Sequence, residues 1–359
     1  MGEVQKNRIS SVNIVFLVTI LISVIVPFLP LEFLWERPAV QILLSQGLIA
    51  APAIVYMVIN RLPYKETVRL KKMKFTDMLL ALLFGILIQP AISLINALSM
   101  VVASNTTGAT MLGITEKLPF LGGIFLLAVV PAVMEESVYR GVFYYEYSKV
   151  NPWKAALLSG LLFGVMHGNL NQFSYAAVMG IVFALLVEAT DSILSTMLVH
   201  FWTNASSVVM LYLYPKLYQL AQSFYEMYRE YGNETMATML ETAFGDLTQN
   251  AEEWTRQTLE AASMLELTVP QVLTLYGPQA LLMGAAAVWV YRKLAIRSGN
   301  WERICSSFRT QKPLREESET SVTLEVEPKQ RLITIPLVIA LVIGIAYMFL
   351  FEVLIQRTM

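Results

Sequence analysis

Apolar stretches of about 20 residues recur along the whole chain, and they constrain its fold more than any other feature. A helix of about 20 residues crosses the roughly 30 Å hydrocarbon core of a bilayer, so each stretch predicts a transmembrane helix. The composition agrees, since 56% of the residues are hydrophobic and only 15% are charged. Because the stretches are continuously apolar and do not alternate, we predict an all-α fold, a polytopic membrane helical bundle of about eight to nine transmembrane helices.

The predicted spans cover residues 12–30, 39–60, 77–103, 119–146, 153–168, 173–188, 193–213, 271–291 and 332–353. The fifth and sixth spans are short and are joined by GNLNQ, so they either cross the bilayer or form a buried, re-entrant pair. The first span is longer than a signal-peptide core and no small-residue cleavage site follows it, so we expect it to be retained.

The placement of Lys and Arg predicts the orientation. Most of the 26 basic residues fall in loops on one side, including RLPYKETVRLKKMK after the second span and YRKLAIR after the eighth. By the positive-inside rule this side is cytoplasmic, so we expect a multi-pass protein of the cell membrane with a cytoplasmic N-terminus. Apolar residues lie among the lysines of 61–76, which predicts contact with the anionic bilayer surface and not with nucleic acid.

Four regions follow from these patterns. They are N-terminal membrane helices (1–118), core membrane helices (119–213), an extracytoplasmic insertion (214–270) and C-terminal membrane helices (271–359). In the insertion, acidic residues outnumber basic ones and apolar positions recur at helical spacing. This pattern predicts two amphipathic helices that either form a solvated cap or gate a substrate. In the last region, residues from about 297 to 331 are highly charged and predict a cytoplasmic linker.

Ionisable residues are few within the spans, and most of them are grouped in the core helices. Glu135, Glu136 and Arg140 lie in the fourth span, His167 ends the fifth, and His200 lies in the seventh. A charged side chain at mid-membrane costs roughly 2.5 to 3.5 kcal/mol on insertion scales, so such residues indicate a functional site. These two histidines are the only ones in the chain.

The two adjacent glutamates point in different directions. Glu136 and Arg140 are four residues apart with the acid first, which is the favourable order for an ion pair within one helix. Glu135 points about 100° away from Glu136. It therefore needs protonation, water or a group on another helix.

Polar groups on the neighbouring spans supply candidate partners. Phe163 precedes His167 by one turn, and Asn204 follows His200 by one turn. A carboxylate and an imidazole can hold and deprotonate a water, while a second imidazole and a carboxamide can donate to a developing oxyanion. Pro131 frees a backbone carbonyl one turn earlier and can kink the fourth span, which opens space for water.

Three motifs occur in order on successive predicted helices: Glu-Glu-x-x-x-Arg at 135–140, Phe-x-x-x-His at 163–167 and His-x-x-x-Asn at 200–204. In this order and membrane setting the sequence resembles the CPBP intramembrane proteases, which include the type II CAAX prenyl endopeptidases and bacterial relatives linked to bacteriocin processing or immunity. The resemblance covers about 119–210. It implies an endopeptidase that acts on a membrane-associated or lipidated peptide or protein.

The resemblance also implies a role for each motif residue. The first glutamate and the first histidine of the family's motifs activate water, which implies this role for Glu135 and His167. The last histidine and asparagine form an oxyanion site, here His200 and Asn204. The remaining glutamate and arginine of the first motif organise the site. This role falls here to Glu136 and Arg140.

Alternative chemistries and functions remain open at the level of sequence. We expect no cofactor, but Glu135, His167 and His200 are the ligand types of a zinc site, although the H-E-x-x-H spacing is absent. A proton-coupled transporter or a non-catalytic membrane scaffold would also place ionisable residues inside the membrane. We further expect the site to lie nearer the cytoplasmic face, because His200 is about two turns from the inner end of its span.

The inner end of the fourth span is rich in tyrosine. Tyr139, Tyr144, Tyr145 and Tyr147 follow the charged motif within a short stretch. Because tyrosine is enriched where a bilayer meets water, we predict that these four form an interfacial aromatic belt.

Overall fold

The computed structural model describes residues 2–30, 37–263, 267–308 and 331–358, and within these ranges the chain forms helices and no strand. In chain order the helical elements are α1 (Gly2–Ile25), η1 (Val26–Phe28), α3 (Pro38–Ile59), α4 (Tyr64–Thr67), α5 (Phe75–Met100), α6 (Thr107–Thr115), α7 (Phe120–Ile124), η2 (Phe125–Val129), α8 (Val130–Glu136), η3 (Ser137–Phe143), α9 (Tyr144–Ser148), α10 (Pro152–Met166), α11 (Leu170–Thr190), α12 (Ile193–Glu230), α13 (Glu234–Phe244), α14 (Ala251–Ser263), α15 (Val269–Arg297), α16 (Trp301–Phe308) and α17 (Ile335–Thr358).

Eight helices in the described part of the chain are long and apolar enough to cross a membrane, which confirms the predicted all-α polytopic bundle. The elements α7 to α9 together form one of these, Phe120–Ser148. Of the two short spans predicted in the core, α11 is long enough to cross, whereas α10 has 15 residues and is shorter than a full span.

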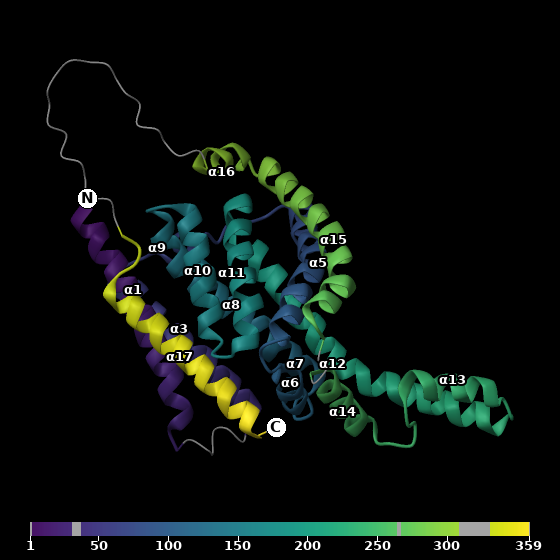
Figure 1. Ribbon diagram of the computed structural model, residues 1–359. Coiled ribbons are helices and arrows are strands. Elements are labelled where there is room, and N and C mark those ends of the chain that lie inside the picture. Colours follow the sequence, from purple (N-terminus) through teal and green to yellow (C-terminus); the bar gives the residue numbers. More distant parts are fainter. Residues whose placement is uncertain (1, 31–36, 264–266, 309–330, 359) are drawn as a thin grey trace, which may run out of the picture.

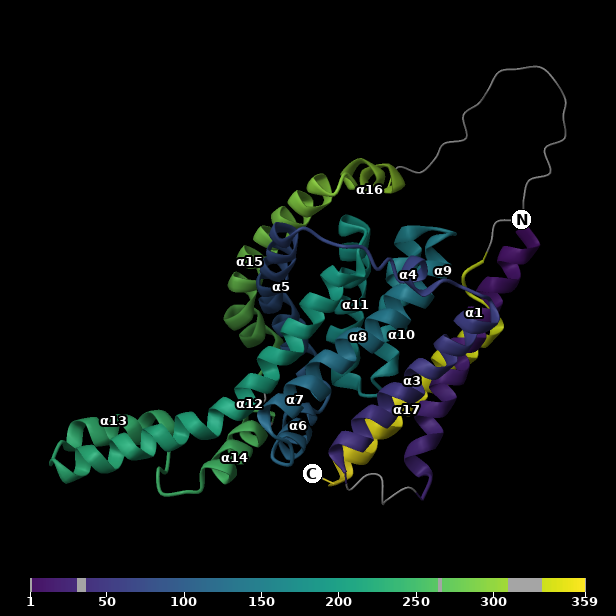
Figure 2. The ribbon, with the colours of Figure 1, turned by 180° about the vertical axis from the view of Figure 1, so that it is seen from behind.

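The bundle has two distinct ends (Figures 1 and 2). The loops of residues 61–74 and 149–151, together with α16, lie at one end, which we call the basic end. At the other end lie α6, α7 and α14, beside the acidic extension that includes α13, and we call this the hairpin end. The described start of the predicted 297–331 linker is helical as α16, while 309–330 lie outside the described residues.

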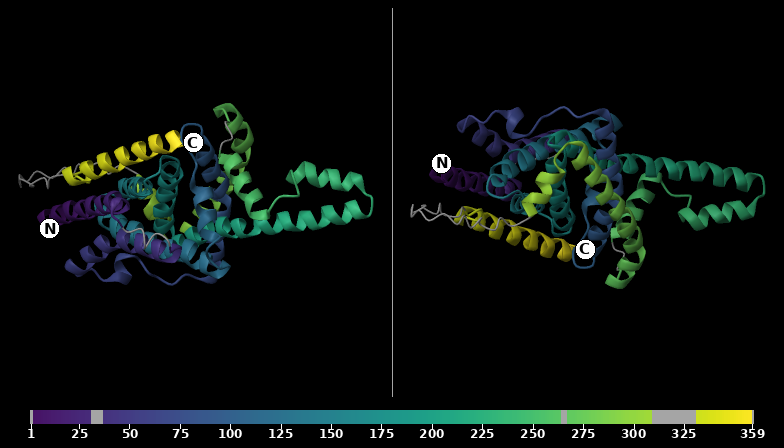
Figure 3. Two further views of the ribbon diagram at one scale, coloured as in Figure 1. Left: turned by 90° about the horizontal axis from the view of Figure 1, so that it is seen from below. Right: turned by 90° about the horizontal axis from the view of Figure 1, so that it is seen from above.

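Helix α12 is longer than the predicted span 193–213, because it continues without a break to Glu230. Its 38 residues correspond to about 57 Å of helix, nearly twice the thickness of a hydrocarbon core. The distal part extends away from the bundle and forms a helical hairpin with α13 (Figure 3). Its stability comes from a small core of its own, in which Tyr218 stacks on Trp254 with ring centroids 4.5 Å apart.

The tyrosines of the fourth span are not an interfacial belt, so that prediction was wrong. Tyr139, Tyr144 and Tyr147 are fully buried and Tyr145 is half-buried. The physical reason is that helices α1 and α10 enclose this end of the fourth span. The rings therefore pack against protein, and the Tyr147 hydroxyl donates a 2.5 Å hydrogen bond to Asn13 Oδ1.

Candidate active site

The backbone of the fourth span departs from a regular α-helix on both sides of the two glutamates. The stretches η2 and η3 are π-helical and flank α8, and such insertions are frequent at functional sites. Pro131 has no N–H to offer the carbonyl of Leu127 four residues earlier. Asn204 on α12 donates its Nδ2–H to this carbonyl at 3.2 Å. The carbonyl freed by Pro131 thus binds α12 to the fourth span.

Glu136 forms the centre of a buried charge cluster. Its side chain is fully buried, and its Oε1 lies 3.1 Å from Arg140 Nη1, as expected for residues four apart on a helix. The same oxygen accepts a hydrogen bond from His200 Nδ1 on α12 at 2.9 Å. Because a carboxylate without its proton only accepts hydrogen bonds, Nδ1 of His200 carries a proton. Glu136 therefore orients the His200 ring as well as the Arg140 side chain.

Arg140 lies between two aromatic rings. Its guanidinium carbon is 4.4 Å from the ring centroid of Phe163 and 5.1 Å from that of Phe183. The described residues give its nitrogens no hydrogen-bond partner, so the Glu136 charge and the two π-faces are what stabilise it. The missing side chain of Gly180 leaves room for it, since a Cβ there would lie 3.3 Å from Arg140 Nη2.

Glu135 faces a different set of groups. Its Oε1 accepts a 2.8 Å hydrogen bond from Nε2 of Gln46 on α3, and its Oε2 lies 3.8 Å from Nε2 of His200. The second distance is too long for a direct hydrogen bond and suits one bridging atom of a water or a substrate. The Glu135 side chain is 14% exposed, whereas that of Glu136 is 0% exposed. Glu135 is therefore the more accessible of the two carboxylates.

The His167 ring is hydrogen-bonded to a backbone carbonyl of its own helix. Its Nδ1 lies 2.7 Å from the carbonyl oxygen of Phe163, and a carbonyl cannot donate, so Nδ1 carries the proton. In the neutral ring, Nε2 then has a free lone pair and can accept a proton. The Phe163 ring packs edge-on against His167 at 4.8 Å and lies 6.0 Å from the His200 ring. Phe163 thus separates and orients the two imidazoles.

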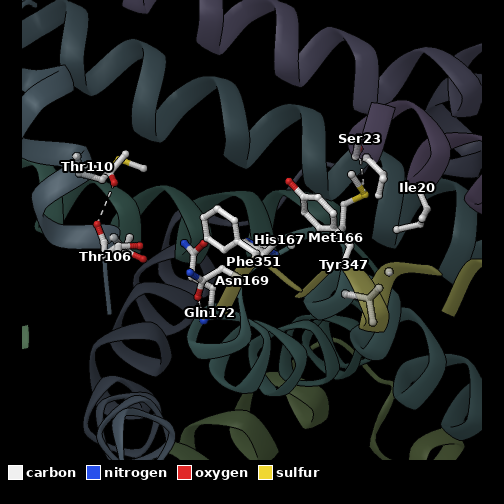
Figure 4. Close-up of a pocket in the computed structure, with 16 residues that line it drawn as sticks. Ile20, Ser23, Thr106, Thr110, Met166, His167, Asn169, Gln172, Tyr347 and Phe351 are labelled. Atoms are coloured by element: carbon white, nitrogen blue, oxygen red, sulfur yellow. Dashed lines mark hydrogen bonds between the residues drawn. The ribbon is translucent and has the colours of Figure 1, made fainter. Parts of the chain in front are cut away.

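A cavity of about 280 Å³ adjoins His167 (Figure 4). Its walls come from α1, α6, the turn between α10 and α11, and α17. None of the lining residues is an aspartate, glutamate, lysine or arginine. These residues are Ile20, Ser23, Val24, Thr106, Thr107, Thr110, Met111, Val165, Met166, His167, Gly168, Asn169, Gln172, Gly344, Tyr347 and Phe351.

Four of the six site residues proposed from the sequence belong to one contact cluster, and the other two do not. Glu135, Glu136, Arg140 and His200 form one contact cluster. His167 has no direct hydrogen bond to Glu135 among the described residues. The sixth residue, the asparagine at 204, uses its amide on the Leu127 carbonyl. The individual catalytic roles remain predictions.

Gln46 is a site residue that the sequence analysis did not identify. It is one of two glutamines in the apolar stretch PAVQILLSQGLIAAPAIVYMVI, and only the packing of α3 against α8 reveals its partner. A polar side chain in the middle of an apolar span was the available signal, since such residues seek a partner within the bundle.

A zinc site does not fit this arrangement. Within the described residues, no three or more His, Cys, Asp or Glu side chains are grouped so that they could hold a metal ion. The Nδ1 hydrogen bonds of His167 and His200 leave both Nε2 atoms available, but Glu135 lies near Nε2 of His200 only.

The fold and these contacts define an integral, multi-pass helical membrane protein with a buried carboxylate and imidazole cluster. Residues 117–206 match the family described as Type II CAAX prenyl endopeptidase Rce1-like. This segment contains all six proposed site residues, and the predicted family resemblance is confirmed for it.

A curated protein that is similar to part of this chain carries the name of a membrane peptidase. The protein named "Putative membrane peptidase YdiL", from Bacillus subtilis (strain 168), is 28% identical over 101 residues. The match covers 28% of this chain and 41% of that protein, so the chain matches less than half of its relative's length. No solved structure matches the chain significantly.

Proposed function

We propose that this protein is an intramembrane endopeptidase that hydrolyses a peptide bond with an activated water. The observation that carries the proposal is Glu135, a partly accessible carboxylate inside the bundle that Gln46 holds at 2.8 Å and that faces His200 at 3.8 Å. The family match over 117–206 supports the same reaction class. Glutamate and imidazole without a metal are sufficient for this chemistry.

The reaction begins with a water held by Glu135 and the Nε2 lone pair of His167. Glu135 removes one proton, and the water oxygen forms a bond to the substrate's carbonyl carbon. In its doubly protonated form, His200 donates an Nε2–H hydrogen bond to the resulting oxyanion and keeps this proton, and the second Nδ2–H of Asn204 adds to this site. Glu135 then returns its proton to the amine nitrogen as the C–N bond breaks. The products are a carboxylic acid and an amine.

Glu136 and Arg140 act through other residues in this scheme. Glu136 orients the His200 ring through a 2.9 Å hydrogen bond, and Arg140 pairs with the Glu136 carboxylate while packing against Phe163. We propose that the substrate is a membrane-associated or lipidated peptide or protein, and that the enzyme lies in the cell membrane with its N-terminus in the cytoplasm.

Comparison of membrane peptidomes tests the proposal. Cells that produce the wild-type protein are compared with cells that produce Glu135→Gln, which keeps the size of the side chain and an acceptor oxygen for Gln46. Glu66→Gln, at an exposed position of the short helix α4, is the matched control. Peptide fragments present with wild type and Glu66→Gln but absent with Glu135→Gln support hydrolysis. Identical peptidomes together with a proton flux lost in Glu135→Gln would favour a transporter instead.

A further inference from the structure

The cavity beside His167 belongs to the hairpin end of the bundle. Helix α6 forms one wall, and α6 lies at that end beside α14 (Figures 1 and 4). The turn after α10 and the first turn of α11 form another part, through Asn169 and Gln172 respectively. His167 lies at the end of α10 that is far from the basic end, whereas His200 lies about two turns from the start of α12 at the basic end. The site therefore extends away from the basic end.

The two ends carry opposite charge. Lysines and arginines dominate the loops at the basic end, including Arg61, Lys65, Arg69, Lys71, Lys72 and Lys74 before α5. Acidic residues dominate the described part of the hairpin and of α14, including Glu226, Glu230, Glu234, Glu241, Asp246, Glu252, Glu253 and Glu260. In membrane proteins short loops rich in Lys and Arg remain cytoplasmic, so this charge asymmetry places the hairpin end outside.

From these observations we propose that the cavity opens to the extracytoplasmic side, where it receives an uncharged segment of a membrane-embedded or exported protein. Cleavage of that segment rests on the function proposed above, whereas the direction of opening does not. The structure thus separates the basic, cytoplasmic end of the molecule from the end through which the substrate enters.

The chemistry of the lining selects the substrate. Hydroxyls of Ser23, Thr107, Thr110 and Tyr347 alternate with apolar side chains. A charged substrate residue would lose its hydration there without gaining a counter-ion, which is costly. Hydroxyl oxygens can accept hydrogen bonds from the backbone N–H groups of an extended segment. An uncharged peptide segment with small polar or apolar side chains therefore fits the lining best.

Helix α14, which follows the hairpin of α12 and α13 in the chain, contacts the α6 wall of the cavity. Arg256 of α14 lies 3.3 Å from Glu116, directly after α6, and Leu259 packs beside Gly108 on α6. The acidic extension and the cavity are therefore parts of one face. An extracytoplasmic substrate that contacts the hairpin is already next to the cavity opening.

Cysteine accessibility in intact cells tests the direction of opening. Cys305 is the only cysteine, so a Cys305→Ser background lets one reporter be placed at a time. Thr110→Cys and Thr107→Cys report on the cavity, Thr242→Cys on the hairpin and Ser298→Cys on the basic end. Cells are treated with a membrane-impermeant maleimide before and after permeabilisation.

The proposal expects both cavity reporters and Thr242→Cys to be labelled in intact cells, and Ser298→Cys to be labelled only after permeabilisation. Labelling of the cavity reporters only after permeabilisation, or not at all, would overturn it. The same labelling in a Glu135→Gln background is independent of catalysis. Unchanged cleavage by Glu135→Gln would therefore contradict the proposed function and leave the direction of opening unaffected. The positions of the peptidome fragments within their parent proteins show whether the cleaved segments are extracytoplasmic and uncharged.

Discussion

His200 and Glu136 form a hydrogen bond between two helices, with Nδ1 of the imidazole 2.9 Å from Oε1 of the carboxylate. The bond requires a proton on Nδ1 of His200 and directs Nε2 toward Glu135, 3.8 Å away. Both adjacent glutamates thereby face His200. Glu136 orients the imidazole ring through a hydrogen bond, and Glu135 faces Nε2 of the ring without a direct hydrogen bond. This division of roles leads to different expectations for the two carboxylates.

Glu136→Gln should destabilise the protein, whereas Glu135→Gln should not. Removal of the Glu136 charge leaves the Arg140 guanidinium buried without a counter-ion, which costs about 3 to 5 kcal/mol in the free energy of unfolding. Glu135 is partly exposed and keeps an amide oxygen for Gln46, so its substitution should change stability by less than about 1 kcal/mol. Unfolding measured in detergent or bicelles compares the two variants. Equal losses of stability would contradict the division of roles.

Gln46→Ala should slow cleavage without weakening substrate binding, because Gln46 positions Glu135. A hydrogen bond to a charged group contributes about 1.5 to 3 kcal/mol, which corresponds to roughly 10- to 100-fold in rate. We expect the loss in kcat with KM unchanged. Ser45→Ala is the matched control, because the Ser45 hydroxyl bonds only to Ile42 within the same helix. A raised KM with normal kcat would instead make Gln46 a substrate-binding residue.

Gly180→Ala should disturb the site through helix packing. A Cβ at Gly180 would lie 2.6 Å from Gly160 Cα on α10, closer than real contacts allow. Separation of α10 from α11 would displace both Phe163 and Arg140, so we expect a loss of about 1 to 3 kcal/mol in stability together with reduced cleavage. Gly284→Ala is the control, since nothing lies within 4 Å of its Cβ position on α15. It should be neutral or slightly stabilising.

Glu188→Ala should loosen the basic end. The buried carboxylate binds Arg69 through Oε1 and Arg303 of α16 through Oε2. Although burial disfavours the charged form of Arg69, the Glu188 carboxylate holds the pKa of that guanidinium above its ordinary value. We expect Glu188→Ala to cost about 3 kcal/mol in the free energy of unfolding.

The exposed ion pair at the same end provides the control for Glu188. Lys71 binds Asp191 with both side chains accessible to solvent, so Lys71→Ala should cost less than about 1 kcal/mol. The same unfolding measurement is made on both variants. A cost for Lys71→Ala as large as that for Glu188→Ala would show that burial of the Glu188 carboxylate is not what matters.

The parts of the site that follow helix periodicity could be predicted from the sequence. The Glu136 and Arg140 pair and the different direction of Glu135 depend on spacing along one helix. The Leu127 carbonyl freed by Pro131 is likewise a local consequence of the missing N–H, although its acceptance of Asn204 required the fold.

Relationships between distant helices could not be predicted in this way. Gln46 meets Glu135 across 89 positions of sequence, and His200 reaches Glu136 across 64. Apolar spans carry no signal that states which faces meet, because lipid and protein both accept apolar side chains. The burial of Tyr139 and the unbroken extension of α12 have the same origin, since each depends on what packs beside the element.

The role of Glu135 as the general base is tested by the cleavage rate of purified protein in a bilayer, with a peptide taken from the fragments that the peptidomes identify. We expect wild type to cleave the peptide and Glu135→Gln to lose at least about 100-fold of the rate, the usual contribution of a general base, while remaining folded. Cleavage by Glu135→Gln at the wild-type rate would show that Glu135 does not activate the water.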